Sequence, residues 1–529
     1  MAKKAAPPQW TGLESLIATI SPSWAKSRMA ARGMLAIGGD VLGGFTGARN
    51  TPQLAGFQPG IGDADSETVY DLPQLRARSS DLIRNSAAAV AAVETKVVSV
   101  VGTGLTMQSR ISADFLGLTP EQAMEWQKNV EREFEVWASS CWSDFYETQN
   151  FYEQQDLALR SMLERGDSFA LLTDKQRRGW PYKLAIQLIE ADRVSNRDWG
   201  HDTPTMVQGI VKDSNGVPKA ALICNRHEGH YLMVDDAVWT QVQFYGTNSG
   251  RRNLLHLFQK RRPGQTRGIP YLAPIIQTIK QFTRYSDAEV DAAVRSAAMA
   301  FFAKMDPDAF EELYDEEAQA QYIGNAQQWD GTIKSGQAVN LLPGESIESP
   351  MQTRPNPNFG TFFDAIMLQV GMALSIPKEV LTKAFASSYS ASRAAMLEWW
   401  RIVRISREFI ESKFCQPIYE EWLAEMVAEG RVNAPGFFGD PAVRAAWCGA
   451  KWIGDGPGSI QPDVEANAAE TRLRIGLTTL DEETIAYDGG DWELKHAQQA
   501  REREMREADG LIPPQVDPNA APAGPQPPP

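Results

Sequence analysis

Two histidines are the residues best suited, by type and spacing, to bind a metal ion. His227 and His230 form an H-x-x-H pattern in the segment NRHEGHY, and Asp235 and Asp236 follow nearby. Imidazole nitrogens and carboxylate oxygens are zinc ligands, and a hydrolytic zinc site keeps one position open for water. One hypothesis is therefore a metal-assisted hydrolase. The segment has no helical pattern that would place both rings on one face, so this spacing alone does not establish a site.

Motifs for nucleotide chemistry are absent from the sequence. It contains no G-x-x-x-x-G-K-[ST] phosphate loop. Gly102 and Gly104 in VGTGL lack the third glycine of a dinucleotide-binding motif. Arg165–Asp167 spell an adhesion tripeptide, at a position where a helix needs a glycine to end. Our leading expectation is a protein with no cofactor, no metal and no catalytic residue.

Positive charge is concentrated in two places. Arg251–Arg267 contains six lysines and arginines and no acidic residue in seventeen positions. Phosphate contact would explain this stretch, and so would a strand end followed by a solvated turn. Lys378 and Lys383 lie in the segment IPKEVLTKAFASSY, which we expect to be a loop between two helices. These two lysines could either contact a moving polymer or bind the unpaired backbone groups at helix ends.

The overall composition is typical of a globular protein. The chain has 529 residues, 43% of them apolar, and a formal net charge of −15. This charge argues against a broad basic surface that grips nucleic acid, but it does not exclude DNA sliding past the protein. The four cysteines show no C-x-x-C spacing, so we expect reduced thiols. We expect neither a membrane span nor a secretion signal, because no run of eighteen apolar residues exists and AAPPQW follows Lys4.

The first part of the chain predicts an arm followed by helices. Residues 1–75 are rich in Gly, Pro, Ala and Ser and predict a flexible arm. From Asp81 a single helical pattern runs until Gly102. Thr119, followed by Pro120 and Gln122, predicts a helix start with a capping box.

The next part predicts a domain that combines a helix with antiparallel strands. Phe151–Arg165 reads as a helix that ends at Gly166. SFALLTD and YKLAIQLIE read as paired strands, and GIVKD and KAALIC flank Asn215 and Gly216, a strong hairpin signal. Up to about residue 260 the expected fold class is α+β.

A long amphipathic helix is predicted from Ile275 to Lys304. No Gly or Pro interrupts this range, which would span roughly 45 Å as a helix. Apolar positions such as Ile279 and Phe282 recur every three or four residues. A charged stripe has the same spacing and consists of Arg284, Asp287, Asp291 and Arg295.

An acidic run and two further helices follow. Seven acids in twelve residues form either a solvated face or a docking surface: Asp306, Asp308, Glu311, Glu312, Asp315, Glu316 and Glu317. FFDAIMLQVGMAL then reads as a helix ended by Pro377. Ser390 is expected to cap a third helix that reaches about Glu429 with a bend at Pro417. From Pro513 the chain becomes proline-rich, which predicts disorder.

Six sequence strings carry a resemblance to a known family. They are LIRNSAAAVAAVETKVVSVVGTGL, LIEADRVSN, PGQTRGIPYL, LLPGESIE, SYSASRAAMLEWWR and WIGDGPGSIQPDVEANA. In their order and spacing they resemble the portal proteins of tailed bacteriophages, in particular the lambda-type portal family, over roughly residues 70–495. One departure is Gln461–Glu465, where the family often has Asp-Pro followed by a basic residue and Glu.

The resemblance implies a ring-forming subunit with an α/β wing, a two-helix stem, a small α/β clip and a helical crown. The implied parts are a wing at 76–268, a first stem helix at 269–304, a clip at 305–352, a second stem helix at 353–376, a tunnel loop at 377–389, a long wing helix with wing completion at 390–460 and a crown at 461–512. The arm at 1–75 and a disordered tail at 513–529 flank them.

The resemblance also implies a function without catalysis. It implies a ring, usually of twelve copies, at one capsid vertex, through which double-stranded DNA is packaged and ejected. The implied partners are the terminase large subunit, the major capsid or scaffold protein and a head–tail adaptor, with no membrane. The implied location is the virion, and the host cytoplasm during assembly.

Site residues follow from this resemblance as candidates only. The tunnel-loop candidates for facing DNA are Lys378, Lys383, Ser387, Ser388 and Tyr389. The family motif positions are Gly264, Gln265, Thr266, Arg267, Gly268, Tyr389, Ser390 and Arg393. The stem candidates are the charged stripe, Arg284, Asp287, Asp291 and Arg295. The docking candidates are the seven acids of the acidic run at 306–317. Beside the metal-assisted hydrolase, an adaptor or scaffold protein of the same particle is a further alternative, although such chains are typically much shorter.

Overall fold

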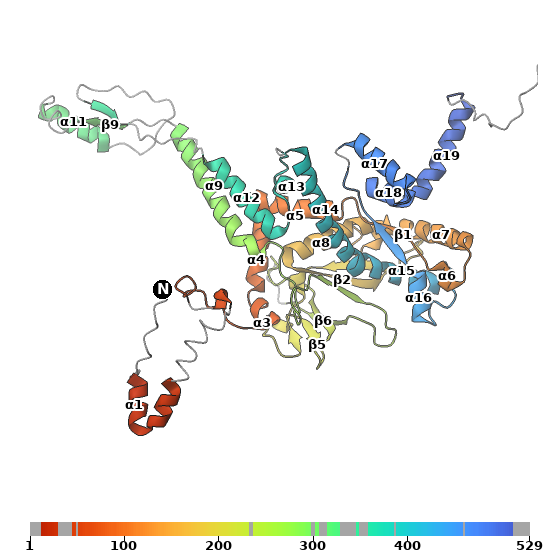
Figure 1. Cartoon of the computed structure of the whole chain (residues 1–529), viewed down its shortest axis with the longest axis horizontal. Helices are drawn as coiled ribbons and strands as arrows, with labels where there is room; N and C mark the ends of the chain where they lie inside the picture. The colour runs from red at the N-terminus through yellow and green to blue at the C-terminus, as the bar shows by residue number, and fades with distance from the viewer. Residues whose placement is uncertain are drawn as a thin grey trace, which may run out of the picture. The chain divides into compact units, whose positions relative to one another are not determined.

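The computed structural model of the chain describes residues 12–29, 45–48, 51–231, 236–297, 302–305, 315–327, 345–348, 358–385, 388–458 and 461–511. The chain divides into two compact units, Met1–Asp63 and Ala64–Pro529. The first unit contains helix α1 (Gly12–Ile20), a helical stretch over 22–29 and a 3-10 turn at Thr46–Ala48 (Figure 1). Within the described residues, no helix has the length and apolar character that a membrane span requires.

The expected arm at 1–75 is too long by about one helix. Helix α3 (Ala64–Thr68) belongs to the second unit, because Asp65 accepts hydrogen bonds from Thr266 and pairs with Lys212 at 2.9 Å. Helix α4 (Leu72–Asn85) follows directly. The composition of residues 1–75 therefore did not reveal that α3, at its end, packs on the second unit.

The single helix expected from Asp81 to Gly102 is in fact two helices. Helix α4 ends at Asn85 and α5 (Ala87–Val100) begins after Ser86, whose backbone is extended at φ −120° and ψ 118°. The serine side chain can hydrogen-bond to nearby backbone groups in non-helical conformations. Serine is therefore disfavoured inside a helix and favoured at its start, which explains the break at Ser86. Gly102, at φ +58°, leads to strand β1 (Thr106–Ser109).

The helix start predicted from the capping pattern at Thr119 is confirmed, and a capping box that was not predicted starts the next helix. Helix α7 (Pro120–Ala138) has a capping box in which the Gln122 N–H donates to the Thr119 hydroxyl at 3.3 Å. Helix α8 (Phe151–Arg165) has a second capping box, at Asn150 and Glu153, and ends at Gly166. These boxes satisfy backbone N–H groups that have no partner inside the helix.

Two antiparallel sheets confirm the α+β class and both predicted strand pairs. The first sheet has the order β3-β2-β8, with strands β2 (Asp167–Asp174), β3 (Leu184–Ile189) and β8 (Leu254–Phe258). The second has the order β4-β5-β6-β7, with strands at Met206–Val207, Ile210–Lys212, Pro218–Cys224 and Trp239–Gln243. Strands β5 and β6 form the hairpin expected around Gly216.

The long helix expected to reach Lys304 is shorter among the described residues. Helix α9 (Ile276–Ala297) is followed by strand β9 (Phe302–Met305), which pairs antiparallel with β10 (Glu345–Glu348). The pairing partner lies about forty residues further along the chain, so the helical pattern over 302–304 was overridden by a contact that no local pattern could reveal. Helix α11 (Glu316–Gln327) lies between these two strands in the sequence.

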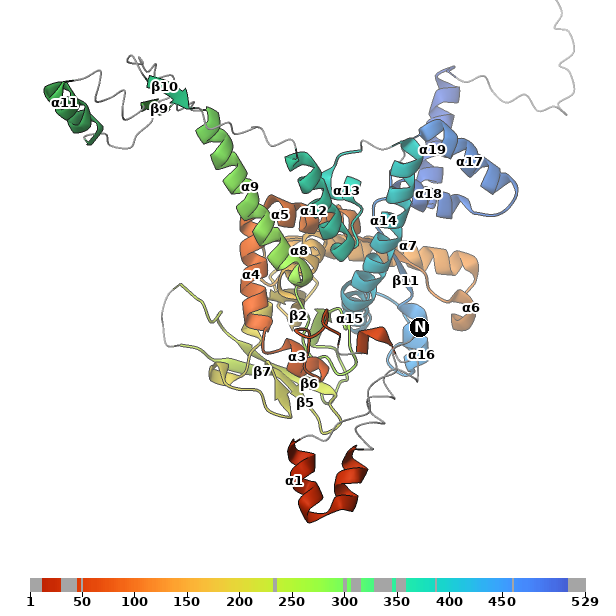
Figure 2. The same ribbon diagram turned by 60° about the vertical axis from the view of Figure 1, so that its left-hand side comes forward.

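Helix α12 (Phe359–Leu374) returns antiparallel alongside α9 (Figure 2). Ring pairs connect the two helices, with Phe282 and Phe363 at 5.5 Å and Tyr285 and Phe362 at 4.7 Å between centroids. Helix α12 ends as predicted shortly before Pro377, at a left-handed Ser375. The expected loop after it instead contains a short helix, α13 (Lys378–Thr382), which packs against α5 and α12.

The third long helix is confirmed, but its cap lies two residues earlier than predicted. Helix α14 (Tyr389–Ile410) starts after Ser388, whose extended ψ of 154° makes it the cap, while Ser390 lies inside the first turn. A π-helical turn at Glu411–Cys415 precedes α15 (Gln416–Ala428). This irregular turn lies next to Pro417, which has no N–H to donate to the preceding turn.

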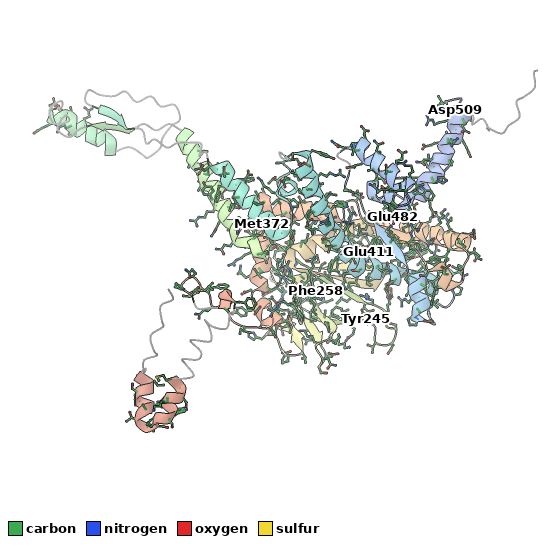
Figure 3. The ribbon with its side chains drawn as sticks, viewed as in Figure 1. Tyr245, Phe258, Met372, Glu411, Glu482 and Asp509 are labelled. Atoms are coloured by element: carbon green, nitrogen blue, oxygen red, sulfur yellow. The ribbon has the colours of Figure 1, made fainter. Side chains whose placement is uncertain are left out.

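The remaining elements complete the chain, and the three C-terminal helices among them contain no buried residue (Figure 3). They are α6 (Ala113–Leu116), α16 (Pro441–Trp447), β11 (Ala450–Ile453), α17 (Pro462–Arg474), α18 (Leu480–Asp488) and α19 (Trp492–Ala508). Strand β11 pairs with β1, far away in the sequence. Phe134 of α7 is buried and makes edge contacts with Tyr419 and Trp422 of α15, so one aromatic core joins helices that lie far apart in the sequence.

Candidate functional site

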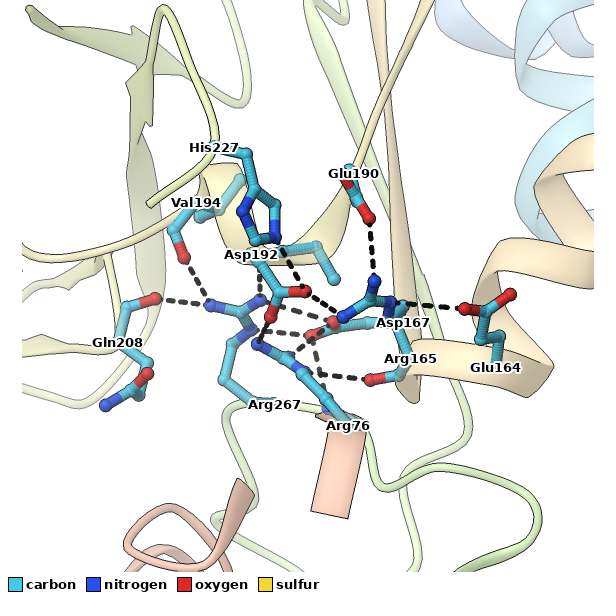
Figure 4. Close-up of polar contacts among 12 residues, drawn as sticks. Arg76, Glu164, Arg165, Asp167, Glu190, Asp192, Val194, Gln208, His227 and Arg267 are labelled. Carbon is cyan, nitrogen blue, oxygen red and sulfur yellow. Dashed lines mark hydrogen bonds and ion pairs between the residues drawn. The ribbon is translucent and has the colours of Figure 1, made fainter. Parts of the chain in front are cut away.

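A buried cluster of charges lies where α8 ends and β2 begins (Figure 4). Asp167, the first residue of β2, has no exposed surface, and Arg267 and Arg76 are only 1% and 3% exposed. Arg267 Nε donates to Asp167 Oδ2 at 2.6 Å, and Arg76 Nη2 donates to Asp167 Oδ1 at 2.8 Å. One carboxylate thus pairs with two arginines from distant parts of the chain.

Arg267 uses its remaining donors on backbone carbonyls. Its guanidinium donates to the carbonyls of Ala191 at 2.7 Å and Val194 at 2.8 Å, and also to that of Gln208. The guanidinium also lies 5.2 Å from the ring centre of Phe169. Because arginine offers five donors in a planar arrangement, it can join this many groups where lysine could not.

A second carboxylate extends the cluster towards the surface. Asp192, in a 3-10 turn at Ala191–Arg193, accepts from Arg76 Nη1 at 3.1 Å and from Arg165 Nη1 at 2.6 Å. Arg165 also pairs with Glu190 at 3.1 Å. His227 Nε2 lies 3.5 Å from Asp192. The cluster is therefore a continuous network of alternating charges.

Both aspartates are ionised at neutral pH. Burial alone would raise the pKa of Asp167, but the charges of Arg267 and Arg76 and a hydrogen bond from His256 hold this pKa far below its usual range. Burial also acts to raise the pKa of Asp192, yet the nearby His227 and two arginines lower it to about 2. Burial lowers the pKa of His256, so its ring is neutral and donates to Asp167 at 3.1 Å.

The ligand atoms of Glu190, Asp192 and His227 lie within 4.8 Å of one another, as in a metal site. His227 Nδ1, however, accepts the Gly229 N–H at 2.8 Å, which puts the ring proton on Nε2, facing Asp192. Arg165 lies against both carboxylates. A cation would have to displace this guanidinium, so the donor set does not fit a metal ion.

The metal ligands hypothesised from the sequence are not brought together. His230 stacks on Tyr231, and Asp236 pairs with Arg226 at 3.1 Å. Asp235 lies outside the described residues. Of the hypothesised ligands that the structure describes, only His227 belongs to the group of possible metal ligands that the fold assembles. The carboxylates of that group, Glu190 and Asp192, come from a different segment.

The family motif positions 264–268 form a compact loop before α9. Gly264 occupies an exposed turn at φ +84°, and buried Gln265 accepts the Arg261 N–H at 2.8 Å and donates to the Arg267 carbonyl at 2.8 Å. Thr266 N–H donates to Asp65 at 2.8 Å. Of the two explanations left open for the basic stretch, phosphate contact does not apply to Arg267, because this residue is buried.

Gly268 lies against Gly166, the residue that ends α8. A Cβ on Gly268 would lie 1.9 Å from the Gly166 carbonyl oxygen. Shortly afterwards, Tyr271 N–H donates to the Leu163 carbonyl at 2.9 Å, and its hydroxyl donates to the Leu374 carbonyl at 2.5 Å. The charge cluster and these backbone contacts together attach the start of α9 to α8 and to the end of α12.

The tunnel-loop candidates are only partly available for binding. Lys378 pairs with Asp364 of α12 at 2.9 Å, and Lys383 has a left-handed backbone at φ +54° after α13. Ser388 and Tyr389 start α14, and Ser387 lies outside the described residues.

The start of α14 is joined to α17 through Arg393. This arginine contacts the Tyr389 hydroxyl at 3.3 Å and pairs with Glu465 at 2.8 Å. Ser390, by contrast, is exposed, with its hydroxyl 3.3 Å from that of Ser388. Of the family motif positions Ser390 and Arg393, it is Arg393 that joins α14 to another helix of the chain, through its ion pair with Glu465.

Stem and docking candidates are exposed where they are described. Arg284, Asp287 and Asp291 of α9 are exposed and make no ion pair with any described residue, while the side chain of Arg295 is not described. Asp315, Glu316 and Glu317 are exposed at the start of α11, where Asp315 accepts the Ala318 N–H at 2.8 Å. The other acidic candidates lie outside the described residues: Asp306, Asp308, Glu311 and Glu312.

The acidic centre of the cluster was not predicted from the sequence. Asp167 had appeared only in a chance tripeptide, and its one local signal is an acid that directly precedes the apolar strand residues SFALL. Asp192 lies inside the string LIEADRVSN, which carries part of the family resemblance but gives no local signal for the role of this acid. Arg76 and His256 carry no local signal, because their contacts span 91 and 89 residues.

Comparison of the sequence with known proteins identifies one family. The chain matches the family described as phage portal protein, lambda family, over residues 50–407. It is 25% identical over 500 residues to a portal protein of Escherichia phage N15, covering 89% of this chain and 91% of that protein. It is 24% identical over 489 residues to portal protein B of Escherichia phage lambda, covering 87% and 89%. A solved structure described as the neck of an empty GTA particle computed with C6 symmetry contains a chain with a TM-score of 0.45 and 12% identity, covering 82% of this chain and 96% of that one. Because the family match spans well over half of its length, this chain belongs to the lambda family of phage portal proteins.

Proposed function

We propose that twelve copies of this chain form a ring at one vertex of a phage capsid and that double-stranded DNA enters and leaves through its centre. The family match over residues 50–407 is the observation that carries this proposal. The surface of α9 supports it, because Val290 and Val294 are 61% and 64% exposed on a long helix. Neighbouring copies of the same chain would cover these side chains in a closed ring.

In this proposal each part of the fold has a place in the ring. Helices α9 and α12 form the stem, and β9, α11 and β10 form the clip at one end. Helix α13 with the following residues forms the tunnel loop, and α17–α19 form the crown. The two sheets with α4, α5, α7, α8, α14 and α15 form the wing, and the buried charge cluster fixes the stem to this wing.

The proposed partners follow the same arrangement. The acidic start of α11 would dock the terminase large subunit during packaging and a head–tail adaptor afterwards, through complementary charge. The wing would contact the major capsid or scaffold protein. The protein would act in the virion, after assembly in the host cytoplasm, without catalysing a reaction.

Electron microscopy of the purified protein tests the ring. We expect end-on views with a central hole and twelvefold symmetry in negatively stained samples. Protein that remains monomeric under all assembly conditions would contradict the proposal.

Within this function, Lys383 is the better candidate for DNA contact in the tunnel loop. Lys378 is already paired with Asp364, whereas Lys383 lies at the end of α13. Replacing both lysines with alanine should change genome packaging or retention while rings still form. The exposed Lys219, on the hairpin of β5 and β6, provides a control substitution that should leave packaging unchanged. Normal packaging by the double variant would exclude a role for these lysines.

A further inference from the structure

A groove with a volume of about 630 Å³ lies between α14 and the C-terminal helices α17 and α18. Its wall carries apolar and aromatic side chains, namely Met396, Leu397, Trp400, Val464, Leu480 and Tyr487. Leu397, Val464 and Tyr487 are 56%, 58% and 64% exposed. Exposed apolar residues are common when scattered, but a contiguous group around a groove marks a binding surface.

The charges around this groove cancel one another. Three basic and three acidic residues line it: Arg393, Arg472, Lys495, Asp463, Glu465 and Glu483. Arg393 pairs with Glu465 at 2.8 Å and Arg472 with Glu483 at 2.7 Å. Lys495 pairs with Asp488. A strongly charged partner therefore gains little here, and an uncharged apolar segment fits better.

One segment of this chain has the matching chemistry. Residues 512–529, IPPQVDPNAAPAGPQPPP, lie outside the described residues and contain eight prolines but only one charged side chain, Asp517. Proline-rich segments bind aromatic-lined grooves as a polyproline II helix, because this conformation is already favoured before binding. We propose that residues 512–529 bind in the groove between α14, α17 and α18 of their own chain.

Residues 512–529 are long enough to reach back to the groove. Helix α19 starts beside the groove, since Lys495 lines it, and ends at Ala508. The thirteen helical steps from Lys495 to Ala508 carry the chain about 20 Å away at 1.5 Å per step. Eighteen residues in a polyproline II helix span about 56 Å at 3.1 Å each, which is more than enough. Attachment to the same chain also raises the effective concentration of the segment at the groove.

A fluorescent label on the tail of the full-length chain tests the proposal. Cys141 is the exposed cysteine and the other three are buried, so Cys141→Ser provides a background for labelling Ala521→Cys with bimane, which tryptophan quenches on contact. We expect the label to be quenched. Trp400→Phe should abolish this quenching, and so should Leu397→Glu, because it places a charge in the apolar wall.

Matched controls separate groove binding from general effects. Ile405→Glu changes a residue of the same helix that is 68% exposed and does not line the groove, so quenching should persist. A synthetic peptide of residues 512–529 should compete and restore fluorescence, whereas the same peptide with alanine in place of proline should not.

Three results would overturn the proposal. The first is fluorescence that is unchanged by both Trp400→Phe and Leu397→Glu. The second is equal competition by the alanine peptide. The third is quenching that appears when labelled Trp400→Phe chains are mixed with unlabelled wild-type chains, because the tail would then occupy the groove of a different copy.

Discussion

At the scale of single residues, Asp167 is the group on which two buried arginines depend. Asp167→Asn keeps the size of the side chain but leaves Arg267 and Arg76 buried without their shared counter-charge. We expect a loss of about 3–5 kcal/mol in the free energy of unfolding, as for other broken buried ion pairs. Guanidinium denaturation followed by tryptophan fluorescence measures this loss.

A surface ion pair serves as the control for this substitution. Arg503 and Glu507 pair at 3.0 Å on α19 with both side chains partly exposed. Glu507→Gln should cost no more than about 1 kcal/mol. If Asp167→Asn costs no more than this control, the buried cluster does not stabilise the fold as we argue.

Glu131 of α7 should give the protein a pH-dependent stability near neutrality. Burial raises its pKa to about 7, with Asp491 and Glu493 adding to the rise, although its carboxylate accepts the Ser109 N–H at 2.8 Å. The folded chain therefore holds this proton more tightly than the unfolded chain, whose ordinary pKa is 4.5. Stability contributed by the protonated form is lost as pH rises from about 4.5 to about 7.

Replacing Glu131 with Gln tests this sign. The variant should show a flatter melting temperature between pH 5 and pH 8 and should melt at a higher temperature than the wild type at pH 8. Glu125→Gln, at an exposed position of the same helix, should follow the wild-type curve. Identical pH profiles for the wild type and Glu131→Gln would disprove the prediction.

At the scale of elements, the loop before α9 depends on two glycines in different ways. Gly268→Ala would place a Cβ 1.9 Å from the Gly166 carbonyl, so α8 and the loop could not approach as they do. Gly264→Ala meets open space but requires a left-handed backbone at φ +84°, which costs roughly 1–2 kcal/mol. We expect Gly268→Ala to lower the melting temperature clearly more than Gly264→Ala.

Limited proteolysis of the same two variants shows where the damage lies. Cleavage after the arginines of 261–267 should increase strongly in Gly268→Ala, because the loop no longer closes onto α8. Similar proteolysis and melting in both variants would mean that the glycine contact does not hold the loop.

At the scale of the whole molecule, the exposed apolar residues of α9 should matter for assembly rather than for folding. Val290→Asp combined with Val294→Asp changes side chains that are 61% and 64% exposed, so the circular dichroism of the folded chain should not change. If neighbouring copies cover these residues, buried carboxylates would strongly disfavour the ring. Sedimentation velocity should then show monomers where the wild type forms rings.

A control substitution checks that this effect is local to α9. Val217→Asp, in the hairpin between β5 and β6, changes a valine that is 47% exposed and should leave ring formation unchanged. Rings formed equally well by the α9 variant would show that this helix does not contribute to the subunit interface.

The sequence by itself determined the features that depend on neighbouring residues. Thr119 with Gln122, Gly166 and the Asn215–Gly216 turn each satisfy or redirect the backbone within a few positions, so their patterns were sufficient. The order of the six strings also pointed to the portal family, because family membership is a property of the whole sequence. The α+β class followed from the same local signals.

Only the tertiary structure decided the features that join distant segments. Asp167 meets Arg76 and Arg267 across 91 and 100 residues, so no spacing rule could pair them. Strand β9 formed in place of the last predicted helical turn because β10 supplies its hydrogen bonds. Arg267 looked in sequence like a surface base and lies in the interior, because the free energy of burying a charge depends on which opposite charge the fold brings beside it.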